Sequence, residues 1–342
     1  MRTFIIAVVL ATASSVLSSA PEVPGLSQAR QISPSVPDQK IPDKPPSLPD
    51  DALFADPPLS ATLAPPPNLD EQRRIMALVV NYVSAIIHRL PNFFADRTTA
   101  HLEDWPMGYE AHDQIPARYI RPRVVSTTRA RVTYRHGKED ADPLPRKGYK
   151  ARPEFGLEAW GLFGPILATV MIDSGRSTLA WSGWTQGATG PLAVFHYSVP
   201  MESSGYEIRF CCVPVAGVLS MLDRRSAYHG NIVVEPETGV IRQLTVQADL
   251  DQGDLPTLIG EAEEGTPLRR ADMWIQYGPV EIAGKTYNLP LKSVAISRAR
   301  TVVLKGRQNL TLGPLKTFIN ETTFTNYHVF RSESKIIIPV NP

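Results

Sequence analysis

The hydrophobic pattern is clearest over residues 75–90, where apolar side chains recur every three or four positions. The series consists of Ile75, Leu78, Val79, Tyr82, Val83, Ile86, Ile87 and Leu90. This spacing places all of them along one side of an α-helix. Asn68, followed three residues later by Glu71, provides a capping-box start, and Pro91 ends the run. The pattern predicts a long amphipathic helix whose apolar side packs on another element, which we expect to be a sheet.

A second, interrupted helical pattern covers residues 156–172. Its apolar side consists of Trp160, Phe163, Leu167, Val170 and Met171. Gly161, Gly164 and Pro165 interrupt the pattern. We therefore expect a short helix, a break before Pro165, and one or two further turns that begin at this proline. Gly175 is expected to end the segment.

Most of the remaining chain has short apolar or alternating stretches separated by glycine and proline, which are typical of strands joined by hairpins. The predicted strands are residues 124–134, 177–184, 192–199, 206–213, 232–235, 240–248, 273–277, 280–282, 286–289, 293–299 and 317–330. This order predicts an α+β fold class: a large curved antiparallel sheet, or half-barrel, with the long N-terminal helix and the second, broken helix packed on its concave face. Residues 249–270 are acidic and are expected to form an exposed insertion.

The first 20 residues have the layout of a secretory signal peptide. Arg2 precedes an apolar run over residues 4–10, and small residues continue to Ala20. The chain is therefore expected to be periplasmic or secreted. Pro21 is unfavourable directly after a cleavage site, so cleavage nearby or retention of the leader as a membrane anchor stays open. No later stretch approaches the ~20 apolar residues of a transmembrane helix, so no transmembrane domain is predicted unless the leader is retained.

Residues 21–67 are rich in proline, which fixes φ and removes backbone donors. They predict an extended, disordered linker, or alternatively a docking site for a proline-binding protein of the cell envelope. Residues 68–342 are then expected to form a single β-rich domain. The charge is nearly balanced, with 35 Lys and Arg against 34 Asp and Glu and no basic block, which argues against nucleic-acid binding.

Catalytic and metal-binding motifs do not stand out in the sequence. None of the seven histidines has the spacing of a metal motif, and no G-x-S-x-G sequence is present. Neighbouring carboxylates such as Glu139 and Asp140 are expected to point apart in a strand or to be solvated in a loop. We therefore predict no catalytic residue, no metal site and no cofactor. A secreted hydrolase built from residues distant in sequence is the less favoured alternative.

The cysteines, Cys211 and Cys212, are adjacent in the sequence. In an oxidising compartment they can form a vicinal disulfide within a tight turn. In a regular strand their side chains would point to opposite faces and could not bond to each other. Phe210 and Val213 on either side favour the strand, so free or partly buried thiols are preferred over the disulfide.

Aromatic residues gather in the sequence around the junction of the second helix and the following strands. Trp160, Phe163, Trp181 and Phe195 are candidates for the lining of an apolar ligand pocket, and the alternative is that they form the core of the domain. Trp181 and Trp184 have opposite parity in a regular strand, so at most one of them is expected to face such a pocket.

The order of signal peptide, long amphipathic helix and a run of strands with a helical interruption resembles the periplasmic lipoprotein carriers of the LolA/LolB type and the related sensor domain of RseB. The segment 75–97 (IMALVVNYVSAIIHRLPNFFADR), Arg131-Val-Thr-Tyr134 and His136-Gly-Lys-Glu139 are also similar to uncharacterised exported bacterial proteins. The carrier resemblance implies an unclosed barrel whose helices cap a hydrophobic cavity for acyl chains. It assigns no functional residue in this chain, and the proline-rich segment departs from the compact carriers.

The leading hypothesis is therefore an exported, non-enzymatic domain that binds an apolar ligand, namely a lipid, an acyl chain or a lipoprotein. The alternative is a structural or protein-interaction module of the cell envelope without a small ligand. This alternative predicts a filled interior and an exposed strand edge or apolar patch.

Overall fold

The structure is a computed structural model that describes residues 52–60, 63–104, 122–143, 155–215, 218–250, 268–305 and 309–329. All of them belong to one compact unit, residues 41–342. The predicted signal peptide, the linker before residue 52, and residues 251–267 of the predicted insertion lie outside the described residues.

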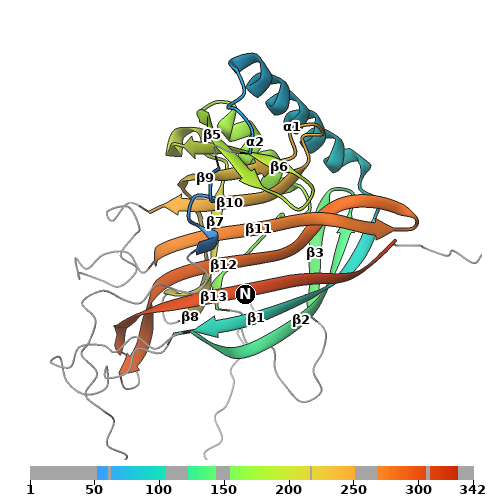
Figure 1. The fold of residues 1–342 in the computed structure, drawn as a ribbon. Coiled ribbons are helices and arrows are strands. Elements are labelled where there is room, and N and C mark those ends of the chain that lie inside the picture. The colour runs from blue at the N-terminus through green and yellow to red at the C-terminus, as the bar shows by residue number, and fades with distance from the viewer. Residues whose placement is uncertain are drawn as a thin grey trace, which may run out of the picture. The chain divides into compact units, whose positions relative to one another are not determined.

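The main element is an open sheet of ten antiparallel strands (Figure 1). Its order is β3-β2-β1-β13-β12-β11-β10-β9-β6-β5, so β3 and β5 are the edges and the sheet is not closed. The strands are β1 (Phe93–Glu103), β2 (Arg123–Arg135), β3 (Lys138–Pro143), β5 (Thr178–Gln186), β6 (Pro191–Val199), β9 (Ala227–Val234), β10 (Ile241–Asp249), β11 (Leu268–Ile282), β12 (Lys285–Lys305) and β13 (Asn309–Val329). The large antiparallel sheet is as predicted, although β1 and β3 were not among the predicted strands.

A second sheet contains β4 (Gly156–Leu157), β7 (Glu207–Val215) and β8 (Val218–Arg225). Side chains of the main sheet hold β4 in place. The Leu157 backbone N–H donates to Ser297 Oγ at 3.1 Å, and Asn320 Nδ2 donates to the Leu157 carbonyl oxygen at 3.1 Å. Gly156 has a φ of +107°, and a Cβ there would lie 3.0 Å from Phe318 Cβ, so this close approach requires glycine.

The described residues include two α-helices, α1 (Leu69–Arg89) and α2 (Pro165–Ser174), together with the short 3₁₀ helix η2 (Met201–Ser203). The Asn68 side chain accepts a hydrogen bond from the Glu71 backbone N–H at 2.9 Å where α1 begins. The second helix begins at Pro165, at the position where this proline loses no intrahelical hydrogen bond. The short helix expected before Gly161 is wrong, because Gly156 and Leu157 pair with β7 as a strand.

The two faces of the main sheet carry separate hydrophobic clusters. Met273 and Ala295 belong to a large cluster that also contains side chains of α1, α2 and β4, and we call this side the inner face. Their neighbours in sequence, Trp274 and Val294, point to the opposite side, the outer face, where they pack with Phe54.

Residues 52–60 and 63–67, here called the strap, contact the main sheet along its outer face and at its β5 edge. Phe54 is buried in the outer-face cluster. Further along, the Asn231 side chain donates to Asp56 Oδ1 at 3.2 Å, and the Ser60 backbone N–H donates to the Trp184 carbonyl oxygen at 2.8 Å. The strap was predicted as part of the disordered linker. Its apolar side chains and hydrogen bonds instead attach it to the sheet.

Replacing Phe54 with alanine is expected to lower the free energy of unfolding by about 2 kcal/mol, because the ring loses its burial among outer-face side chains. The measurement is urea unfolding of the whole chain. Leu59→Ala, in the same strap, is the control, since Leu59 is already about half exposed (47%). Equal stability of Phe54→Ala and the unmodified chain would show that the strap does not contribute to folding.

Candidate functional site

The four aromatic residues predicted to line a pocket lie in different surroundings. Trp181 and Phe195 come together, with ring centroids 5.4 Å apart. Phe163 instead contacts Phe93 at 5.3 Å, and Trp160 donates from Nε1 to the Glu207 carbonyl oxygen at 2.8 Å. Phe163 and Phe195 are buried in the inner-face cluster, and Trp160 and Trp181 pack against it partly buried.

Trp181 and Trp184 lie on the same face of β5, so the prediction that at most one of them could face a pocket is wrong. A register shift between Trp181 and Gly183 places Trp181 opposite Phe195 and Trp184 opposite Ala193, which point to the same face of β6. The two indole rings therefore meet edge to face, with centroids 4.9 Å apart. A β-bulge adds one residue and reverses the alternation beyond it.

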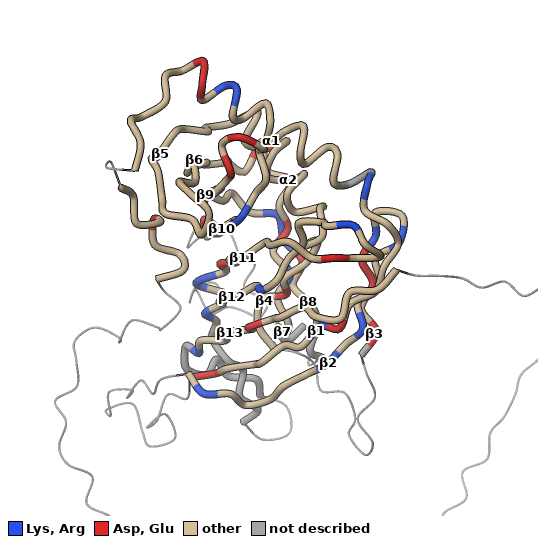
Figure 2. Tube along the Cα trace, turned by 45° about the vertical axis from the view of Figure 1, so that its right-hand side comes forward, with Lys and Arg blue, Asp and Glu red and all other residues tan. Residues whose placement is uncertain are grey.

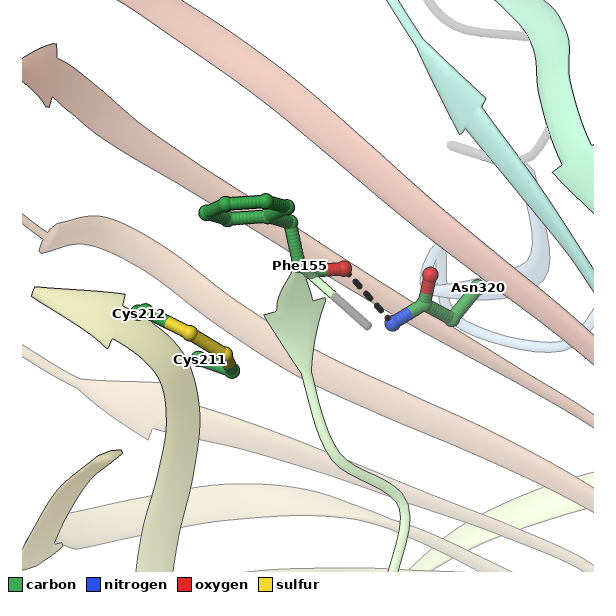
Figure 3. The surroundings of a disulfide bond; sticks show 4 residues. All are labelled: Phe155, Cys211, Cys212 and Asn320. Carbon is green, nitrogen blue, oxygen red and sulfur yellow. Dashed lines mark hydrogen bonds between the residues drawn. A yellow bond between two sulfur atoms is a disulfide. The ribbon is translucent and has the colours of Figure 1, made fainter. Parts of the chain in front are cut away.

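The structure joins Cys211 and Cys212 in a vicinal disulfide on β7, beside Phe155 (Figure 3). The preferred prediction of free thiols assumed a regular strand. Here the pairing with β8 is irregular between Phe210 and Val213, so both cysteines lie where strand alternation is interrupted.

We expect the chain purified without reductant from an oxidising compartment to be two hydrogen atoms lighter than its reduced mass. Denaturation and alkylation should leave both cysteines unmodified unless a reductant is added first. Intact mass spectrometry with and without reductant makes the measurement, and the double variant Cys211→Ser/Cys212→Ser is the control. Full alkylation of the untreated, denatured chain would exclude the disulfide.

The most unusual polar site on the inner face surrounds Glu139, on the edge strand β3. Glu139 lies directly opposite Tyr134 of β2 in the antiparallel register. The backbone N–H groups of Leu162 and Phe163 lie near its carboxylate and favour its charged form. Glu139 Oε2, Tyr134 Oη and Tyr277 Oη are all enclosed without a hydrogen-bond partner. Tyr134 and Tyr277 are only 1% and 3% exposed, so their hydroxyls cannot exchange hydrogen bonds with bulk water.

The loop from Gly161 to Gly164 brings the two backbone donors to Glu139. Both glycines have positive φ, +65° and +149°, which residues with a Cβ rarely adopt. A Cβ on Gly161 would also lie 3.0 Å from Pro165 Cβ, at the start of α2. The loop therefore depends on glycine at its first position to turn into the helix while its N–H groups face β3.

Burial of the carboxylate raises the pKa of Glu139 to about 7. The Arg97 guanidinium and the two backbone donors oppose this increase, and the nearby Glu158 adds to it. Burial also raises the pKa of Tyr277, and Tyr82 and the Glu139 charge raise it further. Burial and the same charge raise the pKa of Tyr134 as well. The Glu139 charge therefore acts on both phenols.

Sequence reasoning missed this site because Glu139 was expected to be a solvated charge. The position of Glu139 in the hairpin could have indicated that it is buried. The His136-Gly137 turn sets Glu139 opposite Tyr134, an aromatic residue of the core. Its neighbour Asp140 is exposed, as a strand residue of opposite parity should be.

Few other groups of ionisable side chains come together in the part of the chain that the structure describes. Its His, Cys, Asp and Glu side chains form no group of three that could hold a metal ion. On the outer face His229 Nδ1 lies 2.7 Å from Asp249 Oδ1, but both side chains are more than a third exposed. The Glu139 site therefore remains the enclosed polar site best suited to hold a ligand group.

No described helix combines the length and the apolar character needed to span a membrane. No protein-family model, curated protein or solved structure matches this chain. The resemblance to the lipoprotein carriers therefore supports only a proposal of function.

Proposed function

We propose that this chain is an exported, non-enzymatic domain that binds an apolar ligand on the inner face of a half-barrel. The ligand would be a lipid, an acyl chain or a lipoprotein. In this proposal α1, α2 and the Gly161–Gly164 loop form a cover over the concave face, as in the carriers that the element order resembles.

The observation that carries the proposal is the way the cover meets the sheet through aromatic side chains. Phe163, in the loop, packs between Phe93 of β1 and Phe324 of β13, with ring centroids 5.3 and 5.2 Å away. An acyl chain entering between cover and sheet would replace these contacts with similar ones. Each buried methylene would contribute about 0.8 kcal/mol, opposed by the free energy of lifting the cover and ordering the chain.

The charge distribution agrees with a ligand other than nucleic acid. Basic and acidic residues are interspersed along the described chain (Figure 2). The proposal involves no catalytic step.

The second candidate function is an interaction module of the cell envelope. Its supporting observation is that Phe163 and Phe195, predicted to line a pocket, are 1% and 2% exposed and so behave as core residues. Phe155 and Met221 are 36% and 44% exposed, and both lie near the Cys211–Cys212 pair. They would supply an apolar contact surface for a partner.

Binding of a fluorescent apolar probe to the delipidated whole chain separates the two candidates. We expect saturable binding of N-phenyl-1-naphthylamine that a long-chain amphiphile displaces. Phe324→Leu, which removes a ring that packs on Phe163, should weaken binding roughly tenfold because an aromatic wall is lost. Leu53→Ala, next to the outer-face cluster, is the matched control and should bind like the unmodified chain. Failure of the probe to saturate, or an equal loss in both variants, would contradict an inner-face site.

A further inference from the structure

We propose that Glu139, Tyr134 and Tyr277 hold the polar head of the ligand, and that they select a head that donates hydrogen bonds, an alcohol or an amine, over an anionic head. This inference rests on the proposed function, and it adds the chemical class of the ligand.

Three enclosed polar atoms have no hydrogen-bond partner, and Glu139 and Tyr134, which carry two of them, lie opposite each other on β3 and β2. Glu139 comes from β3, Tyr134 from β2 and Tyr277 from β11, and each presents an enclosed oxygen without a hydrogen bond. Buried polar atoms in folded proteins are nearly always paired, and exceptions call for an explanation. A hydroxyl or amine can donate to the carboxylate oxygen and accept from a phenol at the same time.

The position of the Glu139 site suits a ligand that enters from the surface. β3 is an edge strand of the open sheet, and the Glu139 residue is partly exposed although its Oε2 is enclosed. The Gly161–Gly164 loop closes over the carboxylate from the side of α2. A ligand head held here would lie near the surface, and its chain would extend inward beside Phe93 and Phe163, the aromatic neighbours of Tyr134.

The charges around Glu139 disfavour an anionic head. The groups whose charges act on the site are the carboxylates of Glu139 and Glu158 and the guanidinium of Arg97. Above neutral pH two negative charges therefore face one positive charge. An anionic head would bring a further negative charge toward an enclosed carboxylate, and like charges in such a position are strongly disfavoured.

The test compares three amphiphiles of equal chain length, dodecylamine, dodecanol and dodecanoate, as competitors of N-phenyl-1-naphthylamine on the whole chain at about pH 8, where Glu139 is ionised. We expect dodecylamine and dodecanol to bind at least roughly tenfold more tightly than dodecanoate. Glu139→Gln should reduce the ratio between amine and carboxylate to within about threefold. Asp140→Asn makes the same charge change at the exposed next residue of β3 and should keep the full ratio.

Tyr134→Phe and Tyr277→Phe provide a second measurement, because each removes one hydroxyl and keeps the ring. Both should fold normally and should weaken the binding of dodecanol, with little effect on dodecanoate. Equal affinity for all three amphiphiles would overturn the head-group assignment and leave the apolar site standing. Binding of none of them would overturn the proposed function, and the inference with it.

Discussion

Replacing Glu139 with glutamine is expected to stabilise the folded protein at pH 8 and to leave its stability nearly unchanged at pH 4. Glutamine keeps an oxygen that can accept from the Leu162 and Phe163 backbone N–H groups, and it carries no charge at either pH. The variant therefore isolates the effect of ionising a buried carboxyl group.

The direction in which the free energy of unfolding changes with pH follows from the two pKa values of Glu139. Its pKa is about 7 in the folded protein against a reference value of 4.5. The folded state therefore binds the proton more tightly than the unfolded state, and the stabilising contribution is fully present below about pH 4.5. It is lost as the pH rises through about 7, by up to roughly 3 kcal/mol in the unmodified chain.

Urea unfolding of both proteins across this pH range gives the difference directly. The gap in unfolding free energy between Glu139→Gln and the unmodified chain should open between about pH 4.5 and 7 and stay constant above. Asp140→Asn serves as the control and should show no such change. A gap that is already present at pH 4, or one that narrows as the pH rises, would show that Glu139 is not buried as a carboxyl group.

Replacing Asn320 with alanine is expected to lower the free energy of unfolding by about 3 to 4 kcal/mol, through the loss of several buried hydrogen bonds at once. The Asn320 side chain donates to the carbonyl oxygens of Phe155 (Figure 3) and Leu157, and its Oδ1 lies 2.8 Å from His101 Nδ1. Because Nδ2 of the amide donates and Oδ1 accepts, His101 carries its proton on Nδ1 and can accept from Thr128 through Nε2.

The control for Asn320→Ala is Thr323→Ala, an exposed position on the same strand β13, where the loss should stay below about 0.5 kcal/mol. Hydrogen exchange of the Gly156 and Leu157 amides should also accelerate in Asn320→Ala, because β4 loses its attachment to the main sheet. An unchanged midpoint of urea unfolding would mean that packing alone holds β4.

The large antiparallel sheet could be predicted because most of its strands alternate apolar and polar residues between clear turns. Pro236-Glu237-Thr238-Gly239 is such a case, since the Glu235 and Val240 backbones are hydrogen-bonded across it. The strand β1 was missed because its inner face carries polar residues in place of apolar ones. Thr99 and His101 are buried through hydrogen bonds to Thr322 and Asn320, partners more than 200 residues away in the sequence.

The candidate site illustrates the same limit. Trp181 and Trp184 share a face only because of a bulge, and the cysteines pair at another irregularity. A bulge depends on how two strands align, which one strand's pattern does not encode. In the sequence Glu139 has the features of a surface charge. Its burial depends on the Gly161–Gly164 loop, whose position the sequence pattern does not predict.

We propose that this exported domain holds an apolar ligand on the inner face of its open sheet. The most direct test is native mass spectrometry, with lipid extraction, of the whole chain recovered from the periplasm, so that the strap remains attached. We expect a stoichiometric co-purifying lipid, or uptake of one from envelope lipids by the stripped protein. A mass that equals the bare chain and does not change after incubation with envelope lipids would contradict it and favour the interaction module.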